Sequence, residues 1–238
     1  MKKLDLSVLP APQRMLWDNL HPFSGFVLYG GTAIALQLGH RQSVDFDFFS
    51  NDPLNLDSLE QELNPIGKAV LLRRLNNTLE YLIDGVKVSF FGSLSFGCIE
   101  APLVSDNGIL VASLVDLFGH KLKVIQQRAE YKDYADIAAL LESGLSLTKG
   151  LSAACSLFSD LNPQVSLRAL SFFGDVHGLS PEQEKVLEAA ASAVREVPVI
   201  HPISHRINAD FTAHGEDIKD SNPAMLPKEE TIAKKKWW

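Results

Sequence analysis

The chain has 238 residues, of which 46% are hydrophobic, and this is enough apolar material for a core of its own. Its formal net charge of −7 excludes proteins that coat nucleic acid non-specifically, because these are usually basic. No apolar run approaches the length of a membrane span, so we expect no membrane association. Two cysteines cannot build a disulfide framework or a four-ligand zinc site, so we expect a cytoplasmic protein.

The first half of the chain predicts mainly strands. Residues 25–30 form a short apolar run that ends in glycines and indicates a strand, whereas 31–39 contain good helix formers and end in glycine. Residues 43–50 alternate strictly between polar and apolar side chains, which is typical of a half-buried strand. Further elements are expected in chain order: a helix over 56–63 and strands over 68–75, 78–83, 86–92 and 108–113.

From residue 114 the apolar period becomes helical. Helices are expected over 114–128, 131–143, 147–159, 164–174 and 181–195. Ser180, Pro181 and Gln183 together mark the start of the last helix. Beyond 196 the chain is polar, proline-rich and aperiodic. We therefore predict three parts: an α/β domain over 1–113, a helical domain over 114–195 and a polar, flexible tail over 196–238.

A pair of glycines and a pair of aspartates lie close together in the first half. Gly30 and Gly31 stand between a predicted strand and a helix N-terminus, where backbone N–H groups approach phosphate oxygens, and Thr32 either caps that helix or touches phosphate. Asp45 and Asp47 share one strand face, where two carboxylates repel one another unless a cation neutralises them. Oxygen ligands suit Mg²⁺ (or Mn²⁺). The alternative is a tight turn followed by a solvated strand face, but the combination favours a site for metal and nucleoside triphosphate.

The segment LYGGTAIALQLGHRQSVDFDFF (28–49) resembles the first motif of the AbiEii/AbiGii toxin group within the nucleotidyltransferase (DNA polymerase β-like) superfamily, in which a Gly-Gly or Gly-Ser turn precedes Asp-x-Asp. The segment GHKLKVIQQRAEYKDYADIAALL (119–141) resembles the helical motifs of the same group. The resemblance, over about residues 25–143, implies an α+β fold with a polymerase-β-like mixed sheet and flanking helices. It also implies metal-dependent transfer of a nucleotide and a role as the toxin of a toxin–antitoxin pair, with an antitoxin protein as partner. For some members the implied acceptor is transfer RNA.

The helical motif contains charged residues near a buried face. Lys121 falls among the apolar positions of its helix, where a lysine either extends toward solvent or reaches triphosphate oxygens. Arg128 follows two turns later on the same face, and Asp133 leans inward to pair with Lys121 or to orient the acceptor hydroxyl. Asp136 is expected to be exposed or to cap a helix. Matching the family pattern suggests phosphate contacts for Arg41 and Ser43, which are otherwise simple surface residues.

One position departs from the family pattern. Ser89 stands where related enzymes carry a third carboxylate, and serine cannot act as a carboxylate base. If Asp84-Gly85 forms a two-residue hairpin turn, Glu80 lies opposite Ser89, and we predict that it supplies the missing carboxylate; a strand glutamate is otherwise a solvated edge charge. RNA binding is expected to be weak and salt-sensitive, because the basic residues near the site are few: Lys68, Arg73, Arg74, Lys123 and Lys132.

The sequence therefore predicts a metal-dependent nucleotidyltransferase that moves a nucleotide from a nucleoside triphosphate to an acceptor hydroxyl. The predicted catalytic residues are Asp45, Asp47, Lys121, Asp133 and Glu80, with the first two holding the metal. The predicted nucleotide-binding residues are Gly30, Gly31, Thr32, Arg41, Ser43 and Arg128. The alternative is a nucleotide-binding or antitoxin-binding module that has lost catalysis; Ser89 supports it, and the retained pair of aspartates argues against it.

Overall fold

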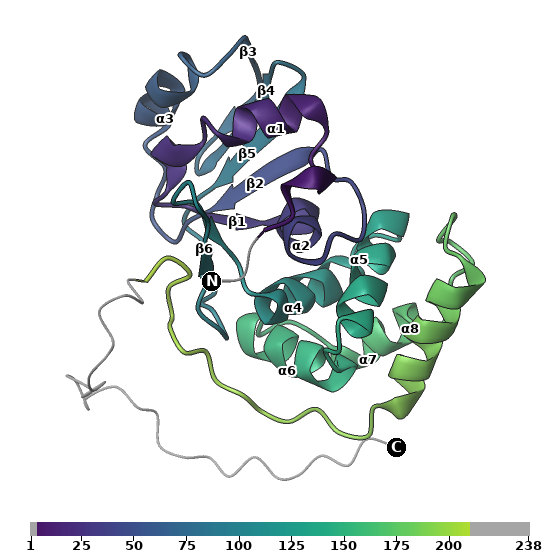
Figure 1. Cartoon of the computed structure of the whole chain (residues 1–238). Coiled ribbons are helices and arrows are strands. Elements are labelled where there is room, and N and C mark those ends of the chain that lie inside the picture. The colour runs from purple at the N-terminus through teal and green to yellow at the C-terminus, as the bar shows by residue number, and fades with distance from the viewer. Residues whose placement is uncertain (1–3, 210–238) are drawn as a thin grey trace, which may run out of the picture. The chain divides into compact units, whose positions relative to one another are not determined.

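A computed structural model describes residues 4–209 (Figure 1). Its centre is a seven-stranded mixed sheet with the strand order β3-β4-β5-β2-β1-β7-β6. The strands are β1 (Val27–Tyr29), β2 (Asp45–Phe49), β3 (Ala69–Leu75), β4 (Thr78–Ile83), β5 (Val86–Phe91), β6 (Leu103–Val104) and β7 (Leu110–Val111). A mixed sheet with flanking helices and a helical C-terminal region confirms the predicted α+β class.

The helices follow the predicted order. They are α1 (Ala11–Trp17), α2 (Gly30–Leu38), α3 (Leu56–Leu63), α4 (Leu114–Val124), α5 (Tyr131–Glu142), α6 (Leu147–Leu157), α7 (Pro163–Ala169) and α8 (Pro181–Ala193), with short 3-10 helices η1 (Leu6–Val8) and η2 (His21–Phe23). Ser180 and Gln183 form the expected capping box at α8. Helix α1 was not among the predicted elements, and the strand expected over 108–113 is only two residues long. Among residues 4–209, no helix has both the length and the apolar character to cross a membrane.

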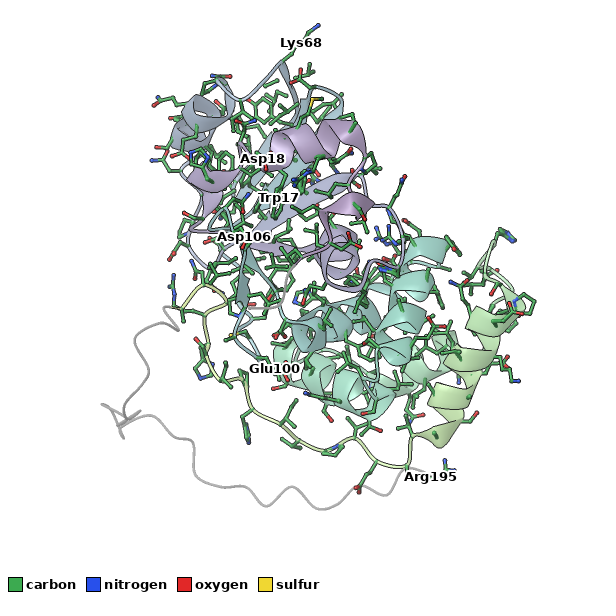
Figure 2. All side chains as sticks on the ribbon, viewed as in Figure 1. Trp17, Asp18, Lys68, Glu100, Asp106 and Arg195 are labelled. Atoms are coloured by element: carbon green, nitrogen blue, oxygen red, sulfur yellow. The ribbon has the colours of Figure 1, made fainter. Side chains whose placement is uncertain are left out.

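The alternation in β2 decides which face of the sheet forms the core. Phe46 and Phe48 are fully buried. Trp17 of α1 stacks on Phe46 with the ring centroids 6.0 Å apart, and Figure 2 shows Trp17 where α1 lies over the sheet. Phe23 of η2 packs 4.9 Å from Phe90 of β5 on the same face. Because side chains alternate along a strand, Asp45 and Asp47 project from the opposite face, as predicted.

The face that carries the aspartates meets the helical region through aromatic side chains. Tyr29 of β1 is the register partner of Asp47, and its ring stacks on Phe49 with centroids 4.7 Å apart. The ring of His120 in α4 lies 4.7 Å from Tyr29 and 6.0 Å from Phe49, so the three rings form one cluster. Helix α4 in turn packs against α5 and α6. These contacts bring the charged face of α4 next to the aspartates of β2.

The predicted hairpin between β4 and β5 is present. Asp84 and Gly85 have φ values of 47° and 86°, the left-handed conformation that a tight two-residue hairpin turn needs at both positions. The register places Glu80 opposite Ser89, and Ser89 opposite Asp47 on β2. Asp84 adopts a positive φ because a short polar side chain tolerates this conformation better than most.

The segment after α8 differs from the expected tail. The Ile203 N–H donates to the Cys98 carbonyl at 2.9 Å, and the Ile207 N–H donates to Asn51 Oδ1 at 2.8 Å. The Ile207 side chain is only 1% exposed. The boundary predicted at 196 is therefore too early, because residues up to 208 pack on the fold as an extended segment whose burial has no periodic pattern. The rest of the expected tail, 210–238, lies outside the described residues.

Candidate active site

A cavity of about 240 Å³ opens beside the two aspartates of β2. Its walls come from the β1–α2 turn, the loop before β2, and α4 with the segment after it. The predicted site residues line this cavity, except for Asp133 and Glu80. The structure thus brings together the two sequence motifs, residues 28–49 and residues 119–141, which are far apart along the chain.

The glycine pair is explained by two close approaches. Gly30 has φ +76°, and a Cβ atom there would lie 2.6 Å from Asp47 Oδ2. A Cβ atom on Gly31 would overlap the guanidinium of Arg41. Any larger residue would therefore push Asp47 or Arg41 out of place. Because α2 begins at this turn, its positive N-terminal end lies beside the Asp47 carboxylate.

Thr32 and Ser43 tie the turn to the start of β2. The Thr32 hydroxyl donates to the Asp45 carbonyl and lies 2.7 Å from the Ser43 hydroxyl. It makes no capping hydrogen bond for α2, so the capping interpretation is wrong. Both residues line the cavity but are largely buried, with 2% and 8% of their surface exposed. Their bonds hold the Asp45 strand against the glycine turn.

The paired carboxylates have the electrostatics of a cation site. Burial raises the pKa of the Asp47 carboxyl, and the charge of Asp45 raises it further, while the charge of Lys87 lowers it. Lys87 lies on β5 directly beside Asp45. A divalent cation would relieve the repulsion that raises the Asp47 pKa. Within residues 4–209 no group of three or more His, Cys, Asp or Glu side chains is placed to hold a metal, so Asp45 and Asp47 have no third carboxylate beside them.

Ser89 and Glu80 occupy the predicted register but not the predicted arrangement. Ser89 is fully buried, and its hydroxyl has no hydrogen-bond partner in the described part of the chain. The Glu80 carboxylate lies 2.9 Å from Lys87 Nζ and does not line the cavity. Sequence reasoning missed Lys87, although the alternation of VKVSFF places it on the face of Ser89 and Asp45. The Glu80 charge is therefore neutralised by Lys87 and is not directed at the aspartates.

Lys121 is held inside the protein by two carboxylates. Its side chain is 8% exposed, and its Nζ lies 2.7 Å from Asp133 Oδ1 and 2.7 Å from Asp136 Oδ2. The pairing with Asp133 is one of the two predicted alternatives, and extension toward solvent is wrong. Arg128 also binds Asp133, with Nε 2.8 Å from Oδ2. Burial raises the pKa of Asp133. Hydrogen bonds and charge from Arg128 and Lys121 lower it further than burial raises it, so the pKa lies below its usual value.

Asp136 was expected to be exposed or to cap a helix, but it is fully buried. It accepts hydrogen bonds from His40 Nε2 at 2.7 Å and from the Arg41 guanidinium at 2.7 and 2.9 Å. Burial raises the pKa of Asp136, but these bonds and the charge of Lys121 hold it well below the usual range. The overlooked signal is the three-residue spacing from Asp133, which puts both carboxylates on one face of α5. Asp136 therefore positions Arg41 and Lys121 at the cavity wall.

The opposite wall of the cavity is apolar and aromatic. The His120 ring lies 4.7 Å from Tyr29, 4.5 Å from Phe96 and 4.9 Å from Phe158. Burial, together with the charge of Lys121, lowers the pKa of His120 to about 3, so it is neutral at physiological pH. The cavity thus has a cationic wall, a pair of carboxylates and an aromatic wall. This combination suits a ligand with phosphates at one end and an apolar ring at the other.

Comparison with known proteins agrees with this chemistry. Residues 14–180, more than half of the chain, match the family model described as nucleotidyl transferase AbiEii toxin, type IV TA system. An uncharacterized protein of Aquifex aeolicus (strain VF5) is 29% identical over 205 residues, which are 82% of this chain and 98% of that protein.

Two solved structures show weaker likeness. A provisionally named nucleotidyltransferase from H. pylori has 18% identity and a TM-score of 0.43, covering 76% of this chain and 90% of that chain. The Megavirus polyadenylate synthase has 15% identity and a TM-score of 0.40, covering 55% of this chain and 31% of that chain. Likeness this weak decides nothing about the site.

Proposed function

The chain belongs to the AbiEii nucleotidyl transferase toxin family of type IV toxin–antitoxin systems, and from this premise we propose that it transfers a nucleotide from a nucleoside triphosphate to an acceptor hydroxyl. The observation that carries the proposal is one cavity lined by the Asp45–Asp47 pair and by four basic side chains. Three of these cations, Arg41, Lys121 and Arg128, are held by buried carboxylates, and the fourth is Lys132.

The three cations would bind the triphosphate. Lys121 and Arg41 are already oriented by Asp136, and Arg128 by Asp133, so little reorganisation is needed when the phosphates arrive. The glycine turn and the N-terminal end of α2 add backbone N–H groups on the same side. In this proposal Asp133 acts through the cations that it holds. Thr32 and Ser43 line the same wall and support its shape.

Asp45 and Asp47 would hold the Mg²⁺ or Mn²⁺ ion. The fit rests on two observations: the aspartates share one strand face, and the pKa of Asp47 is raised. A divalent cation would bind both carboxylates and relieve the repulsion between them. When bound, the ion would neutralise negative charge that builds up on the leaving pyrophosphate.

The transfer itself would form one bond and break one. The acceptor oxygen attacks the α-phosphorus, and the bond from that phosphorus to the bridging oxygen of the pyrophosphate breaks. We propose that Glu80 accepts the hydroxyl proton, for which its carboxylate has to exchange Lys87 for the acceptor. We propose RNA as the acceptor, transfer RNA included, the cytoplasm as the compartment and a cognate antitoxin protein as the regulatory partner.

A second candidate function is a binding module that has lost catalysis. Ser89 at the third carboxylate position and the Glu80–Lys87 ion pair favour it. It predicts that triphosphate and Mg²⁺ bind without transfer. The pair Asp45–Asp47 favours the enzyme, because two carboxylates side by side on one strand face repel each other, and a site without metal does not recover this cost.

The full-length protein should be incubated with α-labelled nucleoside triphosphates, Mg²⁺ and total RNA. We expect label on RNA and a rise in the melting temperature with triphosphate and Mg²⁺ together. Replacing both Asp45 and Asp47 with Asn should abolish both effects, whereas Asp106→Asn at an exposed loop should abolish neither. Glu80→Gln should lower turnover by orders of magnitude and leave the thermal shift. A thermal shift without any labelled product would establish the binding module instead.

A further inference from the structure

The face of the sheet that carries the aspartates continues beyond the cavity, across β5 and β4 to the edge strand β3. The register forms a row from Asp47 through Ser89 and Glu80 to Arg73. A neighbouring row runs from Asp45 through Lys87 and Leu82 to Val70. Figure 1 shows β3 at the edge of the sheet remote from α4–α8, so the helices that wall the cavity do not extend over this part of the face.

Burial distinguishes the two faces on β4 but not on the edge strand β3. On β4, Leu79, Tyr81 and Ile83 are buried in the core, whereas the residues between them are only partly buried. On β3 the side chains of both faces are exposed, with Val70 48% and Leu75 51% exposed on the face of the aspartates and Leu71 47% exposed on the other. Apolar side chains thus lie at the surface in direct continuation of the candidate active site.

The positions of the cations decide from which side the acceptor arrives. In an in-line displacement the attacking and leaving oxygens lie on opposite sides of the phosphorus. Arg41, Lys121 and Arg128, which would hold the leaving phosphates, all come from the side of α2 and α4. The acceptor hydroxyl therefore approaches from the opposite side of the aspartates, over β5 and β4.

The basic residues on this side are placed for phosphates. Lys87 lies beside Asp45 and is balanced by Glu80 at 2.9 Å. Arg73 lies three strands from Asp47, roughly 14 Å away at the usual strand spacing. No ion pair within residues 4–209 includes Arg73, whereas its neighbour Arg74 turns to the other face and binds Asp57 and Glu60.

We propose that the face of β3, β4 and β5 on which Lys87 and Arg73 lie binds the single-stranded end of a polynucleotide acceptor, with Lys87 and Arg73 contacting successive phosphates. The inference rests on the proposed function and specifies its acceptor side. Bases that are not paired present flat apolar faces, and Val70, Leu82 and Leu75 offer apolar side chains between and beside the two cations. A chain with a net charge of −7 needs such a local basic patch to hold a polyanion.

The surface can be tested by binding alone. Fluorescence anisotropy of a labelled single-stranded oligonucleotide, as RNA and as DNA, should be measured with the full-length protein over a range of salt concentrations. Arg73→Gln should weaken binding several-fold and lower the slope of log K against log salt by about 0.7, the value for one contact to a single strand. Lys87→Gln should do the same. Arg74→Gln removes the same charge from the same strand but from the opposite face, and should bind as the wild type does.

Kinetics provide the second readout. Arg73→Gln should raise KM for the polynucleotide and leave KM for the triphosphate unchanged. The thermal shift with triphosphate and Mg²⁺ should be the same in Arg73→Gln, in Arg74→Gln and in the wild type, so failure of the nucleotide site is distinguished from failure of this surface. The proposal is overturned if Arg73→Gln and Arg74→Gln bind alike, if neither oligonucleotide binds, or if the label is transferred to a protein instead of a polynucleotide.

Discussion

The buried His120 makes the stability of the protein depend on pH between the pKa values of its folded and unfolded states. Its folded-state pKa of about 3 lies below the ordinary value of 6.5. Between these values the unfolded chain binds a proton that the folded chain does not. The stability contribution is therefore complete above about pH 6.5 and is lost as the pH falls toward 3.

The size of the loss follows from the shift. At pH 5.0 the solution lies about 1.5 pH units below the unfolded pKa, and each unit is worth about 1.4 kcal/mol, so acidification from pH 7.5 removes about 2 kcal/mol. His120→Phe abolishes this term, because the aromatic ring remains among Tyr29, Phe96 and Phe158 but cannot be protonated. It also removes a buried Nε2 that has no hydrogen-bond partner in the described residues, so the variant should be no less stable at pH 7.5.

Urea denaturation at pH 7.5 and 5.0 measures the effect as a difference between wild type and variant, in which contributions from other titrating groups cancel. We expect wild type to lose about 2 kcal/mol more than His120→Phe on acidification. The exposed His177, changed to Gln, is the matched control and should follow wild type. If wild type and His120→Phe lose the same free energy of unfolding, the histidine is not held neutral by its aromatic surroundings and the reasoning fails.

Three further predictions concern the glycine turn, the buried aspartate and the C-terminal segment. Gly31→Ala should displace Arg41 and weaken triphosphate binding about tenfold or more, measured by calorimetry, and should also lower the melting temperature because Arg41 leaves the buried Asp136; unchanged affinity would argue against phosphate binding by Arg41. Asp136→Asn should cost about 3 kcal/mol in urea denaturation, because it leaves Arg41 without its buried counter-charge and Lys121 with Asp133 alone; a loss as small as that of the exposed Asp175→Asn would contradict this. Truncation after Glu196 should lower stability by about 2 kcal/mol relative to truncation after Asn208, through loss of Ile207; equal melting curves for the two truncated chains would show that residues 197–208 do not support the fold.

Local patterns in the sequence were sufficient for the strands and helices around the site. The alternation of β2 fixes the face of Asp45 and Asp47, and Asp84-Gly85 sets the register that puts Glu80 opposite Ser89. Both are short-range properties, because a strand alternates with a period of two and a tight turn leaves no freedom in the pairing of its strands. The two charged motifs, in residues 28–49 and 119–141, could likewise be recognised from their residue types and spacings.

Tertiary packing decided which charges meet. Asp136 seemed a surface residue by its polarity, yet the packing of α5 on α2 buries it between His40, Arg41 and Lys121. Glu80 has the predicted register, but its carboxylate pairs with Lys87 on the neighbouring strand. The partner of a long charged side chain depends on rotamers and on elements distant in sequence, and neither leaves a periodic trace.

The sequence by itself therefore determined the α+β class, the aspartate pair, the glycine turn and the Lys121–Asp133 pairing as one of two alternatives. Only the tertiary structure decided that Asp136 organises the cationic wall, that Glu80 pairs with Lys87, and that residues 197–208 pack on the fold. The physical reason is the range of the interactions. Backbone conformation and strand register are set by neighbouring residues, whereas a buried ion pair forms only where separate elements remove both partners from water together.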